Sequence, residues 1–278
     1  AIPPHVVLDL PHPITRDKMP HLIRSDADAI AHIELNAPER LNALSDGMLA
    51  ALQSELDSLK DDPDVRVVIL SGAGKAFCAG HDLREMQAGR DSADGGAAAF
   101  HDLFTRCAAV MQTIQALPQP VIAQVHGIAT AAGCQLVATC DLAVASDTCK
   151  FGVNGVNIGL FCSTPMVALT RNIARKPAFE MLTTGGFVDA QKAQTLGLIN
   201  KSVPHADLAQ DTRALATTIA AKLPVAVKTG KQAFYEQAQM TTAEAYAYTG
   251  QIMVENMLDA QTDEGISAFL EKRPPNWG

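Results

Sequence analysis

Three short apolar runs, separated by longer segments with a different pattern, most constrain what this chain can fold into. They are VRVVILSG at 65–72, QPVIAQVHG at 119–127 and DLAVASD at 141–147. Continuous apolar runs of this kind are typical of strands that are covered on both faces of a sheet. Between 45 and 62, apolar residues recur at helical spacing behind Ser45, a residue type that caps helices. Alternating strands and helices predict an α/β fold.

The two ends of the chain differ from this middle part. Residues 28–36 alternate between apolar and polar, which predicts a half-buried strand. Beyond about residue 163, helical segments dominate, so we expect a helical C-terminal third. Small and polar residues at 88–100 predict a loop beside a helix that begins near Ala97. Asp141 opens the third apolar run, where we expect its carboxylate to accept structural hydrogen bonds.

Charge and composition exclude several classes of protein. The formal net charge is -8 and no stretch concentrates Lys and Arg, so we expect no nucleic-acid partner. No apolar run approaches the roughly 18 residues that a membrane span requires, so we expect a soluble globular chain and no membrane partner. The six cysteines show no C-x-x-C pairing or metal-ligand spacing, which predicts reduced thiols and no metal.

The first twenty residues show neither a signal-peptide pattern nor a transit-peptide pattern. The chain also does not begin with Met, so a processed precursor stays open. The compartments that we expect are therefore a bacterial cytoplasm or, if a transit peptide was removed, a mitochondrial matrix.

Two segments rich in small residues follow predicted strands and lead into predicted helices. They are GKAFCAGHDL at 74–83 and HGIATAAGCQL at 126–136. The N–H groups at a helix N-terminus are free and carry partial positive charge. Two such donors aimed at one point would form an oxyanion hole, which stabilises the enolate of a thioester. From spacing alone, close packing of a helix on a sheet explains ATAAG equally well.

An ordered set of motifs carries a family resemblance. These are PERLNALS (38–45), GKAFCAGHDLREM (74–86), VHGIATAAGCQLVATCDLAVAS (125–146), FGVNGVNIGL (151–160), DAQKAQTLGLINKSVP (189–204) and EGISAFLEKR (264–273). From about residue 28 to residue 273, the sequence resembles the crotonase (enoyl-CoA hydratase/isomerase) superfamily.

The resemblance implies a crotonase-type ββα superhelix, or spiral core, at 1–200 with an acyl-CoA site. It implies a helical C-terminal region at 201–278 for trimerisation and coenzyme contact. The expected assembly is a homotrimer or a dimer of trimers. The expected ligand is a coenzyme A thioester substrate, with no permanently bound cofactor.

The resemblance also implies roles for particular residues. The two oxyanion donors would be the backbone N–H groups of His81 and Ala132, the latter followed by Gly133. Coenzyme A would lie along Arg40, Leu41, Ala43, Ala79, His81, Asp82 and Leu83. Phe269 and Lys272 would reach a neighbouring subunit's coenzyme site. From the residues alone, Arg40 and Lys272 are better explained as ordinary solvated charges, whereas the resemblance implies that they contact phosphate groups of the coenzyme.

Two positions depart from the family pattern. Hydratases of this superfamily use two glutamates, and this chain has Gln135 and Gly155 in their places. Gln135 cannot exchange a proton near neutral pH and Gly155 has no side chain. Because an acid or base contributes about 10²–10⁴-fold each, we do not expect efficient hydration. The isomerase variant of the fold keeps the second carboxylate, so Gly155 argues against that reaction as well.

Few other side chains could replace the missing carboxylates. His81 could act as a base, although a structural role is the simpler interpretation. Cys162 and Ser163 precede a predicted helix, where a thiol pKa can fall, but a buried thiol and a helix cap explain them too. Asn154 and Asn157 could position water or a polar acyl group, or could be turn residues.

Three functions remain open. The first is a lyase-type protein that stabilises a thioester enolate in an oxyanion hole. The second is a malonyl-type acyl-CoA decarboxylase, because loss of carbon dioxide needs the hole but little acid or base chemistry. The third is a protein that binds acyl-CoA without turnover.

Overall fold

The structure is a computed structural model, and it describes residues 20–277. Its strands are β1 (Leu22–Ala27), β2 (Ile30–Leu35), β3 (Val67–Gly72), β4 (Val121–Val125), β5 (Ile128–Thr130), β6 (Leu142–Ser146), β7 (Lys150–Gly152), β8 (Phe187–Asp189) and β9 (Lys201–Val203). Its helices are α1 (Asp46–Leu59), α2 (Leu83–Gly89), α3 (Ala97–Ala116), α4 (Ala132–Thr139), α5 (Ser163–Asn172), α6 (Arg175–Thr184), α7 (Ala190–Leu196), α8 (Leu208–Ala220), α9 (Pro224–Gln237), α10 (Thr242–Met257) and α11 (Ala260–Leu270). The short 3-10 helices are η2 (Pro38–Arg40), η3 (Asn154–Ile158) and η4 (His205–Asp207).

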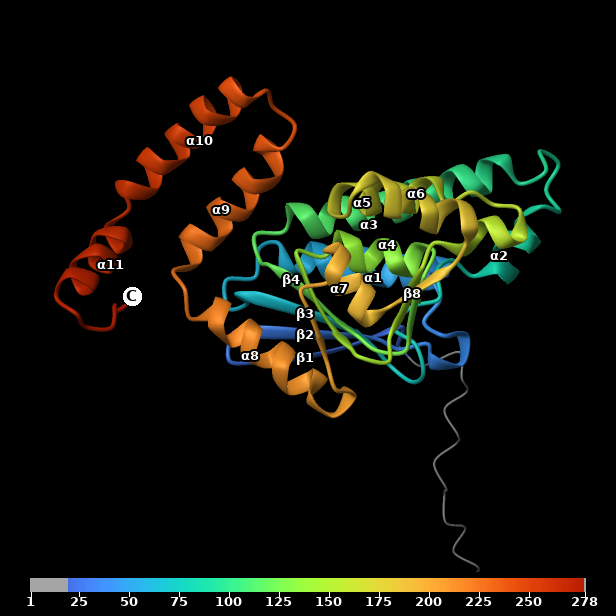
Figure 1. Cartoon of the computed structure of the whole chain (residues 1–278), viewed down its shortest axis with the longest axis horizontal. Helices are drawn as coiled ribbons and strands as arrows, with labels where there is room; N and C mark the ends of the chain where they lie inside the picture. The colour runs from blue at the N-terminus through green and yellow to red at the C-terminus, as the bar shows by residue number, and fades with distance from the viewer. Residues whose placement is uncertain (1–19, 278) are drawn as a thin grey trace, which may run out of the picture.

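Two sheets form the centre of the molecule. The larger has the order β1-β2-β3-β4-β6-β9, and every pair in it except β1–β2 is parallel. The smaller has the order β5-β7-β8. One face of the large sheet packs against α8, and the other packs against the core that includes α1, α3 and α4 (Figure 1). The predicted α/β fold is confirmed.

The first predicted strand differs from the structure at its start. Residues 28–36 were expected to be extended, but Asp28 and Ala29 have φ values of 55° and 60° and form the turn between β1 and β2. Positive φ at both central residues is what a two-residue hairpin turn requires. The predicted cap is confirmed, because the Met48 amide donates to Ser45 Oγ at 3.2 Å.

The C-terminal helices α9, α10 and α11 extend away from the α/β body (Figure 1), and we call them the arm. The division that the sequence placed at residue 200 stays a prediction. β9 and α8 follow residue 200 and still pack on the large sheet. Residues 1–19 of the expected core lie outside the described residues. None of the helices between residues 20 and 277 is long and apolar enough to cross a membrane.

A buried ion pair joins the arm to the body. Lys231 on α9 donates to Asp141 Oδ2 at 2.7 Å and to the carbonyls of Ile114 and Gln119 at 2.8 and 2.9 Å. Asp141 also accepts from the Val121 amide and from the hydroxyl of Tyr235, as an acceptor carboxylate was expected to do. Burial lowers the pKa of Lys231 and raises that of Tyr235.

We predict that Lys231→Ala lowers the free energy of unfolding by about 3 kcal/mol, because removing one partner strands a buried charge. Urea unfolding measures this loss. The matched control is Lys228→Ala on the same helix, where the side chain is exposed and we expect a change of about 0.5 kcal/mol or less. Equal midpoints for the two variants would show that the ion pair does not hold the arm.

Candidate functional site

The two small-residue segments meet at one point in the structure. The segment before α2 is held by the Leu44 amide, which donates to Gly80 O at 2.7 Å. The segment before α4 approaches Gly80 so closely that a Cβ built there would lie 3.2 Å from the Ala132 nitrogen. His81 follows Gly80 directly. The backbone N–H groups of His81 and Ala132 therefore lie on adjoining segments.

Neither of these two N–H groups has an acceptor in the chain. Within residues 20–277, neither His81 N nor Ala132 N donates a hydrogen bond to the backbone or to a side chain. Ala132 is the first residue of α4, where an amide has no partner inside the helix. Both residues line the same cavity. A ligand oxygen in that cavity could accept from both.

The backbone just before α4 is strained. Ala131 has φ 49° and ψ -120°, which an L-amino acid rarely adopts. Its own amide donates to Gly152 O at 2.9 Å, which holds the turn in place. Strain of this kind costs about 1–3 kcal/mol and is found mostly at functional sites. The turn carries the chain from β5 into α4, whose first residue, Ala132, lines the cavity.

Gly133 has a different role from Ala132. A Cβ at Gly133 would lie 2.1 Å from Cys78 O, so α4 rests directly on the Cys78 segment. Only glycine permits this approach. Close packing, which the sequence left open as an explanation for ATAAG, therefore applies to Gly133. It coexists with the free amide of Ala132 one position earlier.

The cavity has a volume of about 430 Å³. Its lining residues are Ala79, His81, Leu83, Met86, Phe104, Thr130, Ala131, Ala132, Asn154, Gly155, Asn157, Ile158, Leu160, Phe161, Cys162, Ser163, Thr164 and Pro165. Among these described residues there is no Lys, Arg, Asp or Glu. The cavity thus combines an apolar wall with a few neutral polar groups, as small-molecule sites commonly do.

Burial shifts the pKa of both titratable side chains in the described lining in the direction that favours the neutral form. Burial lowers the pKa of His81, whose ring packs edge-on against Phe104. His81 Nε2 is buried and has no hydrogen-bond partner among the described residues. Burial raises the pKa of Cys162, so the alternative that its thiol pKa falls at a helix start is wrong. Ser163 begins α5 and does not cap it, because Cys162 holds the cap position.

The two positions that lack glutamates lie in different surroundings. Gly155 lines the cavity, and a Cβ there would lie 2.6 Å from Leu160 O and 2.8 Å from Cys162 Sγ. The loop therefore has no room for a side chain at this position. Gln135 is 5% exposed and is not among the residues that line the cavity. Its Oε1 is buried without a partner in the described chain.

The expected coenzyme residues other than His81 divide between the cavity lining and positions outside it. Ala79 and Leu83 line the cavity. Ala43, two residues after Leu41, is buried and is not among the lining residues. Leu41 and Leu83 are exposed, at 42% and 54%. Asp82 caps α2 by accepting from the Arg84 amide at 2.9 Å.

Arg40 is not a free charge in this structure. Its Nη1 donates to Asp82 Oδ2 at 3.0 Å and lies 3.7 Å from Glu85 Oε1. Burial opposes ionisation of Asp82, but hydrogen bonds from the Arg84 and Glu85 amides and from Arg40 lower its pKa overall. A phosphate contact by Arg40 would therefore compete with this ion pair.

Phe269 and Lys272 lie on the arm. Phe269 is in α11 with 82% of its surface exposed, and Lys272 follows the helix with φ 60°. Figure 1 shows α11 far from the segments that form the cavity of the same chain. These two residues are thus not brought to the cavity within one chain.

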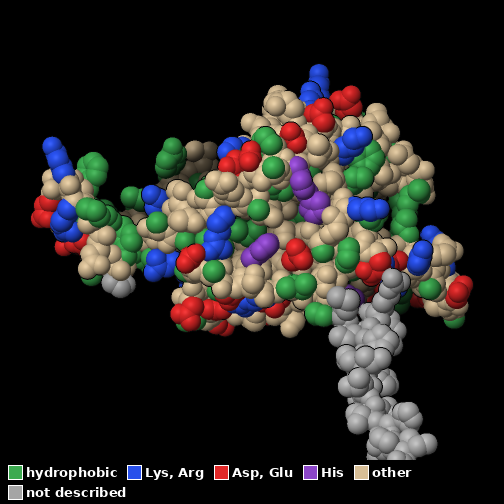
Figure 2. Space-filling view, turned by 90° about the horizontal axis from the view of Figure 1, so that it is seen from below, with side chains coloured by type: hydrophobic (Ala, Val, Ile, Leu, Met, Phe, Trp, Pro, Cys, Tyr) green, Lys and Arg blue, Asp and Glu red, His purple; other side chains and the backbone are tan. Residues whose placement is uncertain are grey.

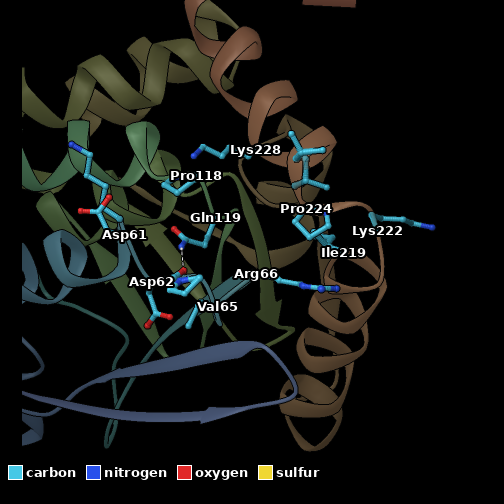
Figure 3. Close-up of a pocket in the computed structure, with 14 residues that line it drawn as sticks. Asp61, Asp62, Val65, Arg66, Pro118, Gln119, Ile219, Lys222, Pro224 and Lys228 are labelled. Carbon is cyan, nitrogen blue, oxygen red and sulfur yellow. Dashed lines mark hydrogen bonds between the residues drawn. The ribbon is translucent and has the colours of Figure 1, made fainter. Parts of the chain in front are cut away.

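A second hollow, of about 500 Å³, lies between the body and the start of α9 (Figure 3). It contains none of the motif residues discussed above. Gln119 stands inside it and donates to Leu59 O at 2.7 Å, while Lys222 points away from it. Two of its charged residues have structural partners, because Arg66 donates to Ala220 O and Asp62 accepts from Arg24. The smaller, apolar cavity is the candidate site.

Several lining residues were not anticipated from the sequence. Met86 and Phe104 come from α2 and α3, whose apolar positions look the same in sequence whether they face a core or a cavity. Thr130 lies in the segment HGIATAAGCQL at 126–136, but its hydrogen-bond partner could not be predicted from the sequence. Its Oγ1 donates to Asn154 Oδ1 at 2.6 Å, across the gap between β5 and η3.

Comparisons with known proteins identify the family to which the chain belongs. Residues 25–278 match the Enoyl-CoA hydratase/isomerase family. The chain is 47% identical over 253 residues to human enoyl-CoA hydratase domain-containing protein 3, described as mitochondrial, covering 90% of this chain and 81% of that protein. It matches the crystal structure of the human protein with a TM-score of 0.88 and 45% identity, over 92% of this chain and all of that one.

A bacterial structure is also similar. The crystal structure of an enoyl-CoA hydratase of Mycobacterium smegmatis matches with a TM-score of 0.90 and 52% identity, over 93% of this chain and 99% of that one. The expected crotonase fold is therefore confirmed. The individual site residues stay predictions.

We predict that Gly155→Ala lowers the free energy of unfolding by about 1–3 kcal/mol, because the added methyl group would overlap Leu160 O and Cys162 Sγ. Thermal or urea unfolding measures the change. Gly230→Ala is the matched control, since nothing lies within 4 Å of a Cβ at that helical position. Alanine is the better helix former, so the control should gain up to about 1 kcal/mol. A Gly155→Ala protein as stable as the parent would show that this loop can admit a side chain.

Proposed function

Because the chain belongs to the enoyl-CoA hydratase/isomerase family, we propose that it binds acyl-CoA thioesters in the 430 Å³ cavity and stabilises their enolates there. One observation carries the proposal. The N–H groups of His81 and Ala132 lie on adjoining segments, line one cavity and have no acceptor within residues 20–277.

The chemistry follows from these two donors. A thioester carbonyl gains negative charge on oxygen when its α-carbon becomes an enolate. Fixed N–H donors in a cavity with little water stabilise that charge more than they stabilise the neutral carbonyl. The remaining wall is mostly apolar with a few neutral polar groups, which suits an uncharged acyl chain. We propose that Ala79 and Leu83 contact the pantetheine at the mouth of the cavity.

We do not propose hydration by two glutamates. The described lining contains no carboxylate, Gly155 has no room for one, and Gln135 is outside the lining. His81 is the one lining imidazole, and its lowered pKa makes it a poor proton donor near neutral pH. Any proton transfer to the α-carbon would then come from water.

We also propose that the protein assembles as a homotrimer or a dimer of trimers. The arm exposes large apolar side chains, visible among charged ones at the left of Figure 2, and these include Tyr246, Leu258, Phe269 and Leu270 at 74–82% exposure. In such an assembly Phe269 and Lys272 would serve a neighbour's coenzyme site. The molar mass in solution checks this. The human relative is described as mitochondrial, which favours the second of the two expected compartments for this chain.

We predict that butyryl-CoA binds about tenfold or more tightly than S-butyl-CoA, a thioether with a methylene group in place of the carbonyl. The difference reflects hydrogen bonds from the His81 and Ala132 amides. Isothermal titration calorimetry measures both dissociation constants. Equal affinity for the two ligands in the parent protein would exclude an oxyanion hole here.

Decarboxylation of a malonyl-type thioester is a second candidate, favoured by the neutral lining. In this reaction the bond between C2 and the carboxyl carbon breaks, carbon dioxide leaves, and the electron pair forms the enolate. C2 then takes a proton from water. A carboxylate bound where there is no cation is destabilised, whereas the enolate oxygen meets two N–H donors. The reaction therefore needs no lining acid or base.

For this second candidate we predict carbon dioxide release from malonyl-, methylmalonyl- or ethylmalonyl-CoA at rates above the buffer background, and slow hydration of crotonyl-CoA. A coupled carbon dioxide assay and the loss of enoyl absorbance measure the two reactions. No release from any of the three thioesters would rule out the decarboxylase. Tight acyl-CoA binding without either reaction would identify a binder without turnover.

A further inference from the structure

We propose that Asn154 is a specificity-determining residue, which selects acyl chains that carry a neutral, hydrogen-bond-accepting oxygen over plain hydrocarbon chains. The inference rests on the proposed function, since it assumes that the acyl group enters the cavity between His81 and Cys162. Asn154 stands one position before Gly155, on the loop where the family's second glutamate would lie.

The orientation of the Asn154 amide is set by Thr130. Thr130 Oγ1 donates to Asn154 Oδ1 at 2.6 Å, so the oxygen of the amide faces β5. The amino group is the other polar end of the same planar side chain. Within residues 20–277, Asn154 Nδ2 donates no hydrogen bond. Since Asn154 is half-buried and lines the cavity, its amino group is left as a donor for a ligand.

The distance between this donor and the oxyanion donors is fixed by two further contacts. Thr130 pairs with Gly152 in the small sheet, and the Ala131 amide donates to Gly152 O at 2.9 Å. These contacts clamp the loop that carries Asn154 onto the segment that carries Ala132. A thioester oxygen held by Ala132 therefore places the acyl chain at a defined separation from Asn154 Nδ2.

The surroundings determine which acceptor suits this donor. The described lining holds no Lys or Arg, so a carboxylate would lose its hydration without gaining an ion pair. Desolvating a ketone or hydroxyl oxygen is less unfavourable than desolvating a carboxylate, and such an oxygen can still accept a hydrogen bond from the Asn154 amide. A plain hydrocarbon chain would instead cover an unsatisfied donor, which is unfavourable. The neutral oxygen is thus the best match.

Asn157, on the same loop, provides the contrast. Its Nδ2 donates to Gly185 O at 3.2 Å, so its donor is already used. It is also exposed. The loop thus holds two asparagines that both line the cavity, and the amide of Asn157 is already hydrogen-bonded within the protein. Asn157→Ala is therefore a matched control for Asn154→Ala.

The experiment compares dissociation constants for butyryl-, 3-hydroxybutyryl- and acetoacetyl-CoA by calorimetry. In the parent protein we expect the two oxygenated thioesters to bind about five- to tenfold more tightly than butyryl-CoA, the gain of one hydrogen bond. Asn154→Ala should abolish this ratio, and it should bind butyryl-CoA at least as tightly as the parent does because the unsatisfied donor is gone. Asn157→Ala should keep the ratio. Thr130→Val, which retains the shape but frees the amide to turn, should reduce it by about half or more.

The outcomes separate this inference from the proposed function. If no thioester binds, the proposed function fails and the inference fails with it. If butyryl-CoA binds as tightly as the oxygenated thioesters, only the inference is overturned. A preference that survives Asn154→Ala would also overturn it. If Asn154→Ala does not fold, an undiminished ratio in Thr130→Val would show that the amide is not held as described.

Discussion

The close approach of two backbone segments, Cys78–Gly80 and Thr130–Gly133, is the constraint on which the rest of the site depends. The approach needs glycine at both contact points. A Cβ at Gly80 would lie 3.0 Å from Ala131 Cβ, and a Cβ at Gly133 would lie 2.1 Å from Cys78 O. With the segments this close, His81 and Ala132, whose N–H groups have no acceptor within residues 20–277, both line one cavity. The same closeness forces Ala131 into an unfavourable conformation that the Gly152 carbonyl then holds.

Much of the fold could be predicted because burial on both faces leaves a clear sequence pattern. The runs that became β3, β4 and β6 are continuous and apolar, and α1 begins at the expected Ser45 cap. β1 was not predicted, since three consecutive polar residues, Arg24, Ser25 and Asp26, interrupt its apolar pattern and its last three residues are exposed. The short β7 and β8 have three residues each and carry too little pattern to detect.

The two backbone segments of the site could be predicted from the sequence, whereas most of the side chains that line the cavity could not. The two small-residue segments were found because they are unusual, and they meet as expected. Gly155 lines the cavity, but Gln135 does not, because its side chain is buried in α4. Met86 and Phe104 could not be foreseen, since an apolar side chain looks the same in sequence wherever it points. The Thr130–Asn154 bond joins residues 24 apart and depends on the pairing of β5 with β7.

The Lys231–Asp141–Tyr235 contacts have a consequence for how copies of the chain could meet. These contacts lie inside one chain and also involve the first amide of β4, so the sheet itself sets the direction in which α9 leaves the body. A surface that is already oriented loses less conformational freedom when it is covered. Any partner of the arm therefore meets a helix α9 whose direction is already fixed. The binding free energy is then not reduced by the cost of ordering a flexible segment.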